Sequence, residues 1–119
     1  MDAEQIREYC LSKTAVTEEC PFDDVTLAFK VMGKIFVLLD LDGDLSLNLK
    51  CDPLRALDLR ERYPAVQPGY HMNKKHWNTV YLDGSMSADH IRQLIDHSYD
   101  MVVSKLSRKL RGELDRLER

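Results

Sequence analysis

The sequence contains little of what marks fibrous, disordered or membrane-spanning proteins. Its 119 residues include 5 glycines and 4 prolines, whereas 44% of the residues are hydrophobic. Collagen-like, low-complexity and wholly disordered classes are therefore excluded. No apolar run approaches the roughly 18 residues that span a bilayer, so no membrane segment is expected. One domain over residues 1–119 is predicted, because two smaller domains would each bury too little apolar surface.

Cysteine is also scarce, and its distribution does not suggest a disulfide scaffold. Cys10, Cys20 and Cys51 are odd in number and form no CxxC pair, which favours a reducing compartment. The first residues, MDAEQIREYC, are acidic and amphipathic, so they lack the basic end and apolar stretch of a signal peptide. We therefore expect a cytoplasmic protein.

Charge is unevenly distributed around a net value of −3. Residues 1–29 contain seven acids and two bases, whereas residues 105–119 contain six bases and three acids. The acidic balance excludes a uniformly basic nucleic-acid coat but leaves room for a local basic patch.

Capping side chains predict four helices. These are residues 3–13 with a capping box of Asp2 and Gln5, about 53–63 after Asp52-Pro53, a long helix after Ser87, and a short helix after Ser107.

Alternating apolar residues predict the strands between these helices. Strands are expected near 25–31, 35–41, 45–49 and 77–82, with a turn or strand entry at 67–69, hairpin turns at Gly33-Lys34 and Asp42-Gly43, and a loop at 17–24. Strands that cluster without βαβ alternation indicate the α+β class. We expect a two-layer fold, with an antiparallel sheet of about five strands and helices mainly on one face.

One face of this sheet is predicted to pack on the helices. It carries Val25, Leu27, Phe29, Leu45, Leu47, Leu49, Val80 and Leu82. The other face then carries Thr26, Lys30, Ser46, Asn48, Lys50, Trp77, Thr79 and Tyr81. Lysines among aromatics suit a phosphate backbone and stacked bases. An ordinary solvated face, or one covered by another chain, has the same composition.

The segment YHMNKKHW, residues 70–77, is the densest in polar and aromatic side chains. Its lysines and histidines could contact phosphates while Trp77 stacks. The alternative is a surface turn held to the body by Tyr70 and Trp77.

No metal, cofactor or catalytic residue is assigned. His71 and His76, or His90 and His97, do not have the i,i+4 spacing of a helical chelate, and Asp40, Asp42 and Asp44 lack the glycine and glutamate of a calcium loop. Cys51 precedes a helix start, where a thiolate is favoured, and could act as a nucleophile with His71 or His76. A buried cysteine at a strand end is the simpler interpretation.

Five segments carry a family resemblance: REYCLS, PFDDVTLAFKVMGKIFVLLDLD, LNLKCDP, YPAVQPGYHMNKKHWNTVYLDG and LIDHSYDMVVSKL. Over nearly the whole chain the sequence resembles the MmcQ/YjbR family of small bacterial proteins. The resemblance implies the element order α-β(3)-α-β(2)-α, similar to the fold of secretion chaperones. The family motif falls on Lys50, Tyr70, His71, Met72, Lys74, Lys75, His76, Trp77 and Asn78.

The resemblance implies a non-enzymatic DNA-binding or regulatory protein, since family members are described as predicted DNA-binding proteins with a double-wing motif. Phosphate contacts are then expected from Lys50, Lys74, Lys75, Arg108, Lys109 and Arg111. His71, His76 and Trp77 would line the site, with Lys30 and Tyr81 on the same face. Binding would be weak and salt-dependent. The alternatives are a protein- or peptide-binding module that uses the same aromatic face, and an enzyme. A monomer or weak homodimer is expected.

Overall fold

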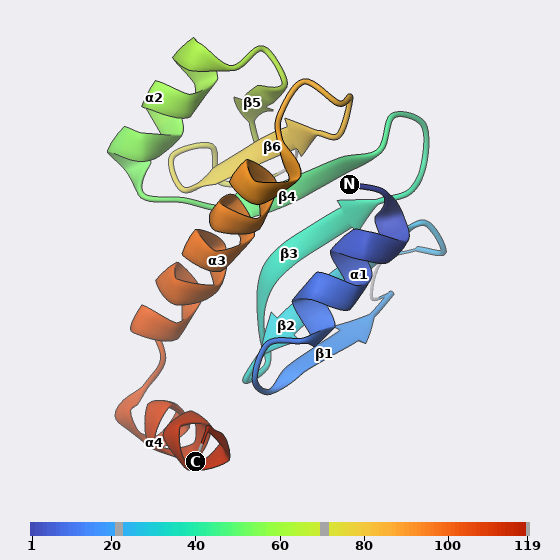
Figure 1. The fold of residues 1–119 in the computed structure, drawn as a ribbon. Helices are drawn as coiled ribbons and strands as arrows, with labels where there is room; N and C mark the ends of the chain where they lie inside the picture. The colour runs from blue at the N-terminus through green and yellow to red at the C-terminus, as the bar shows by residue number, and fades with distance from the viewer. Residues whose placement is uncertain (21–22, 70–71, 119) are drawn as a thin grey trace.

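The computed structural model of the chain describes residues 1–20, 23–69 and 72–118. Its elements are α1 (Ala3–Leu11), β1 (Val16–Glu19), β2 (Thr26–Val31), β3 (Lys34–Asp40), β4 (Ser46–Lys50), α2 (Pro53–Arg62), β5 (Val66–Pro68), β6 (Trp77–Tyr81), α3 (Ala88–Ser104) and α4 (Arg108–Leu117). Helices α1, α2 and α3 lie on one side of the sheet, and α4 follows beyond the end of α3 (Figure 1). The predicted α+β class is confirmed.

The helices begin at the predicted caps. The Asp2 carboxylate accepts the Gln5 N–H at 2.8 Å, and the Gln5 amide oxygen accepts the Asp2 N–H at 2.9 Å, which completes the capping box. The side chains that cap α2, α3 and α4 are Asp52, Ser87 and Ser107. Helix α1 ends at Leu11, two residues earlier than predicted. Within the described ranges, none of the helices is long and apolar enough to cross a membrane.

The sheet is antiparallel throughout, in the order β1-β2-β3-β4-β6-β5. A continuous cross-strand row fixes its register, formed by Leu27, Leu39, Leu47, Val80 and Val66. All but the first of these side chains are at most 1% exposed. Because a slip of one residue would turn the whole row away from the helices, the apolar period of two specifies this register.

The first hairpin turn lies one residue earlier than predicted. Val31 pairs with Lys34, and Met32 and Gly33 have φ values of 50° and 80°. Positive φ at both central residues is typical of the two-residue turns that match strand twist, and glycine occupies the second position without strain. The turn is therefore Met32-Gly33, and Lys34 is the first residue of β3.

Edge strand β1 lies mostly in the segment predicted as a loop, and it raises the number of strands to six. Its burial alternates only between half-buried and exposed, so it lacks the apolar pattern that marks an inner strand. Glu18 instead pairs with Arg7 of α1, and Glu19 pairs with Lys30 of β2. Val25 was expected to face the helices, but it lies outside β2 and is 37% exposed.

Candidate nucleic-acid interface

The open face, meaning the side of the sheet opposite α1–α3, carries three cross-strand pairs along β4 and β6. Ser46 pairs with Tyr81, Asn48 with Thr79, and Lys50 with Trp77. Residues two apart on a strand point to the same side, so these six side chains share one face, as predicted. In the middle row the Thr79 hydroxyl donates to the Asn48 amide oxygen at 2.6 Å. Each end of the face therefore carries one aromatic side chain.

A groove of about 430 Å³ lies beside Trp77, where the end of the open face meets the C-terminal end of α3. We name it the basic groove, because four of its lining residues are lysines. The lining consists of Lys30, Gly33, Lys34, Ile35, Lys50, Met72, Trp77, Val102, Lys105 and Leu106. The lysines come from β2, β3, β4 and the residue that caps the end of α3. A lining that is apolar apart from its lysines suits an anion with an apolar or aromatic part.

A buried serine fixes two walls of the basic groove against α3. The Ser98 hydroxyl accepts the Lys50 N–H at 2.8 Å and donates to the Phe36 carbonyl at 2.5 Å. Phe36 is an extra residue in β3, since Phe29 pairs with Val37 and Lys30 pairs with Ile35. Such a bulge bends its strand locally. Ser98 is fully buried, so one side chain supplies both hydrogen bonds away from water.

The lysines of the basic groove differ in how their charge is compensated. Lys30 forms an ion pair with Glu19. Among residues 1–20, 23–69 and 72–118, Lys34, Lys50 and Lys105 take part in no ion pair. Three uncompensated positive charges around one groove give a local positive potential, although the whole chain is acidic.

The predicted KKHW segment borders the groove without filling it. Lys74 and Lys75 are exposed on the turn between Met72 and Trp77, and neither lysine lines the groove. His76 is half-buried, and its carbonyl accepts the Cys51 N–H at 2.7 Å. Tyr70 and His71 lie outside the described residues. The structure thus places Trp77 and Met72 at the groove and leaves the two lysines outside its lining.

Arg60 of α2, which was not predicted from the sequence, holds the turn before β6 through hydrogen bonds. Its guanidinium donates to the Lys74 carbonyl, to the Trp77 carbonyl at 3.3 Å and to the Asn78 amide oxygen at 2.6 Å. Asn78 is 2% exposed, and its amide nitrogen donates to the Ala56 carbonyl. Asn78 therefore lies on the helix-covered side, where it joins α2 to β6, and not on the open face.

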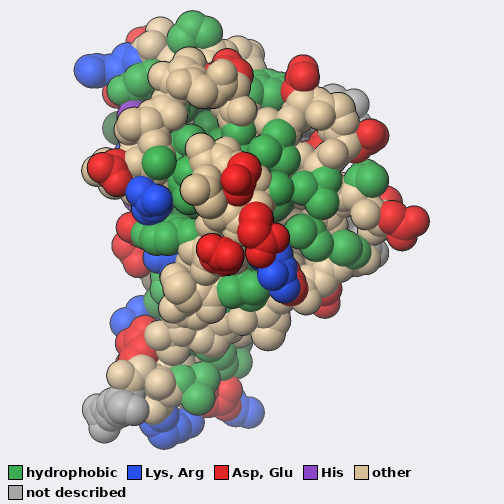
Figure 2. Space-filling model, turned by 45° about the vertical axis from the view of Figure 1, so that its right-hand side comes forward, with side chains coloured by type: hydrophobic (Ala, Val, Ile, Leu, Met, Phe, Trp, Pro, Cys, Tyr) green, Lys and Arg blue, Asp and Glu red, His purple; other side chains and the backbone are tan. Residues whose placement is uncertain are grey.

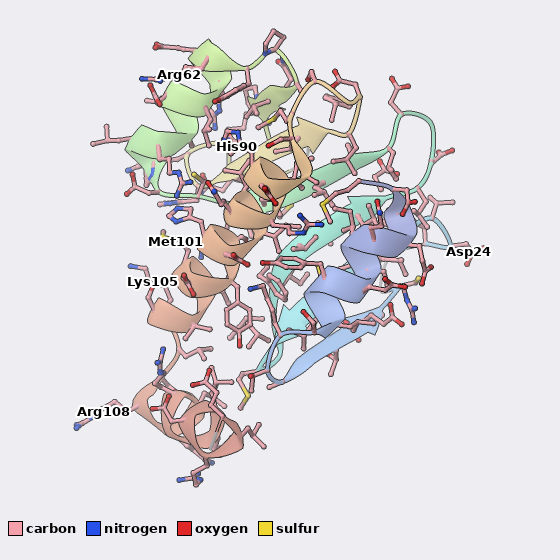
Figure 3. The ribbon with its side chains drawn as sticks, viewed as in Figure 1. Asp24, Arg62, His90, Met101, Lys105 and Arg108 are labelled. Carbon is pink, nitrogen blue, oxygen red and sulfur yellow. The ribbon has the colours of Figure 1, made fainter. Side chains whose placement is uncertain are left out.

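The basic residues of α4 are separate from the groove. Arg108 and Lys109 are exposed, and Arg111 forms an ion pair with Asp115 at 3.0 Å. None of the three lines the groove. Arg108 extends away from α4, whereas Lys105 lies at the end of α3 (Figure 3). The three basic residues of α4 therefore lie outside the groove.

Cys51 lies beside His97, which sequence reasoning did not pair with it. The two residues line a small cavity of about 10 Å³. Burial raises the pKa of the Cys51 thiol, which disfavours the reactive thiolate. The His97 Nε2 atom accepts the Asp52 N–H at 3.1 Å, and burial lowers the pKa of this imidazole. The geometry therefore gives these side chains a packing role. Among the described residues there is also no cluster of three potential metal ligands.

Comparison with known proteins identifies the family. The YjbR family pattern matches residues 11–101. The chain belongs to the YjbR family. It is 43% identical over 90 residues to the uncharacterised protein YbdF of Escherichia coli O157:H7. This alignment covers 75% of this chain and 74% of YbdF. The chain is 32% identical over 118 residues to the uncharacterised protein YjbR of Escherichia coli K12, covering 98% and 100%.

Solved structures of YjbR-like proteins share the fold. The crystal structure of Deinococcus radiodurans DR2400, with a DUF419 domain, superposes with a TM-score of 0.89 at 40% identity and covers 94% of this chain and 86% of that one. A crystal structure from Pseudomonas syringae gives a TM-score of 0.75 at 28% identity, covering 85% and 98%. The predicted family is confirmed.

Proposed function

We propose that this YjbR-family protein is a non-enzymatic DNA-binding protein that holds phosphates in the basic groove. The observation that carries this proposal is the convergence of Lys34 from β3, Lys50 from β4 and Lys105 from the end of α3 around Trp77. Lysines contact phosphates as point charges, and an aromatic side chain beside them offers a stacking surface for a base. A regulatory role and a cytoplasmic location belong to the same proposal.

The number of lysines sets the expected strength of binding. Three phosphate contacts give a slope of about −3 for log affinity against log salt concentration on duplex DNA. The net charge of −3 adds a general repulsion toward a polyanion. We therefore expect weak binding that is clear at low salt and lost near physiological salt.

The test is a titration with mixed-sequence DNA, both as a duplex and as its separated strands, while following Trp77 fluorescence. Trp77 is the only tryptophan and lines the proposed site, so its emission reports occupancy. A saturable change that disappears as salt rises is the expected result. No change with any DNA at high micromolar protein, together with negative gel shifts, would overturn the proposal.

A matched pair of variants separates the groove from the overall charge. Lys50→Gln removes a positive charge from the groove, and we expect it to weaken DNA binding several-fold. Arg62→Gln removes the same charge from the exposed end of α2, far from Lys105 in Figure 3, and serves as the control. Equal effects of the two variants would count against the groove. Salt-tolerant binding of a protein partner that Trp77→Ala abolishes would favour the alternative of a docking module.

A further inference from the structure

The end of the open face opposite the basic groove is negatively charged. A hollow of about 260 Å³, which we name the acidic hollow, is lined by Asp40, Asp42, Asp44, Ser46, Asn48, Thr79 and Tyr81. A neighbouring hollow adds Asp83. Figure 2 shows the side of the molecule that carries α1, away from the open face; acidic side chains also gather there, and Lys and Arg side chains lie among others at the lower end, at α4.

The two charged ends of the open face are close enough for one DNA duplex to lie over both. Lys50 and Ser46 are four residues apart on β4, which corresponds to about 13 Å along an extended strand. Duplex DNA carries about one charge per 1.7 Å of its axis. A duplex laid along the open face would therefore place phosphates near both the lysines and the carboxylates. The repulsion between phosphates and carboxylates at one end would therefore offset much of the attraction between phosphates and lysines at the other.

The interior of the basic groove points to an unpaired base. Its apolar lining includes Ile35, Met72, Trp77 and Leu106. In a duplex the base faces are covered by their stacked neighbours, so an aromatic side chain cannot stack on them. An unpaired base has a free face, and the groove volume of about 430 Å³ is in the range of small-ligand sites.

We infer that the basic groove takes an unpaired nucleotide of a single-stranded nucleic acid in preference to a duplex. The base lies against Trp77 and Met72, and the flanking phosphates contact Lys34, Lys50 and Lys105. The strand leaves the groove away from the acidic hollow, which excludes it by repulsion. This inference rests on the proposed function and narrows its substrate class.

The test compares strand forms of one sequence at constant low salt. Fluorescence anisotropy is measured for an end-labelled 12-nucleotide DNA strand, the RNA of the same sequence, the blunt duplex, and a strand with abasic sugars in place of nucleosides. We expect the DNA or the RNA strand to bind about tenfold more tightly than the duplex, and the abasic strand to lose a similar factor. Which of the two strands binds more tightly identifies the source of the nucleotide.

Two sets of variants test the two halves of the argument. Trp77→Ala should remove the advantage of the base-bearing strand over the abasic one, whereas Trp77→Phe should keep it. Met72→Ala is a second, less disruptive probe of the same stacking surface, since Met72 is half-buried outside any helix or strand. Circular dichroism confirms that each variant is folded.

The acidic hollow is tested with Asp42→Asn/Asp44→Asn, both on the exposed β3–β4 hairpin. This variant should raise the affinity for the duplex several-fold and so reduce the preference for the single strand. Its control, Glu8→Gln/Glu61→Gln, changes the net charge equally at exposed positions on α1 and α2. Equal affinity for duplex and single strand, or for abasic and base-bearing strands, would overturn the inference and leave DNA binding intact. Failure of every nucleic acid to bind would overturn the proposed function itself.

Discussion

The two ends of the open face have the same framework and opposite charge. Each combines one aromatic side chain of β6 with its neighbour on β4, Trp77 with Lys50 at one end and Tyr81 with Ser46 at the other. The acidic hollow takes all three of its carboxylates from one hairpin, close together in sequence. The basic groove takes its lysines from two strands of the first hairpin, from β4 and from the end of α3. The fold, not the local sequence, creates the positive site.

This contrast shows why the net charge predicts little about the ligand. The chain carries −3 overall, yet three lysines without ion-pair partners in the described part of the chain surround one groove. At physiological ionic strength the field of an exposed charge is screened beyond about 8 Å. The two ends, about 13 Å apart along β4, therefore present largely independent potentials.

The most direct way to abolish the contrast is to make both ends acidic. Lys50→Glu/Lys105→Glu replaces two of the lysines of the groove by carboxylates. We expect DNA affinity at low salt to fall on the order of 100-fold, because two phosphate contacts are lost and repulsion replaces them. Anisotropy of a labelled strand measures the loss. The control Arg62→Glu should change affinity less than twofold, and an equal loss there would show that only net charge matters.

A second variant weakens the framework of the basic end alone. Ser98→Ala leaves the Phe36 carbonyl and the Lys50 N–H without their shared partner. Because both groups would then lack a hydrogen bond, we expect the free energy of unfolding to fall by about 2 kcal/mol. Urea denaturation measures it. Ser104→Ala, which removes an exposed hydroxyl of the same helix that donates to the Met101 carbonyl, should cost much less. Equal costs would contradict a bridging role for Ser98.

The features predicted correctly from the sequence are those that local chemistry decides. Asp2 and Gln5 form their capping box within one helical turn, and Asp52, Ser87 and Ser107 cap the helices that follow them. The open face follows from alternation along β4 and β6. Each of these signals needs only neighbouring residues.

The features that were missed depend on contacts between distant residues. Strand β1 is held by Glu18 and Glu19, whose partners Arg7 and Lys30 come from other elements. Lys34 and Lys105 are far apart in sequence, and only the packing of α3 on the bulged β3 brings both to one groove. Alternation along β6 already places Asn78, which belongs to the family motif, on the helix-covered side, but its hydrogen bond with Arg60 of α2 joins residues that are distant in sequence. No local pattern signals such contacts.

A pair of glycine variants tests the support beneath Trp77. A Cβ atom at Gly69 would come 2.8 Å from the Trp77 Cβ, because β5 and β6 approach closely there. Gly69→Ala should therefore lower the free energy of unfolding by about 1–2 kcal/mol through overpacking. Gly112→Ala on α4 meets nothing within 4 Å and should stabilise by about 0.5–1 kcal/mol through helix propensity. Thermal melting of both variants gives the two signs, and a neutral Gly69→Ala would contradict the close approach.

The smallest expected effect is a pH dependence centred on His97, next to the strand end that carries Lys50. Burial lowers the pKa of His97, and Arg55 adds to this effect, whereas Asp52 and Asp100 oppose it. The unfolded chain therefore binds a proton at higher pH than the folded chain does. This difference costs no stability above the usual pKa of about 6.5, and stability is lost as the pH falls from there through the lowered pKa of the folded state. Between pH 7.5 and 5.5 the native protein should lose more stability in urea than His97→Gln, whose side chain does not titrate. If stability falls equally with pH in the two proteins, protonation of His97 does not weaken the fold. The hydrogen bond from the Asp52 N–H to a neutral His97 would then contribute nothing to the pH dependence of stability.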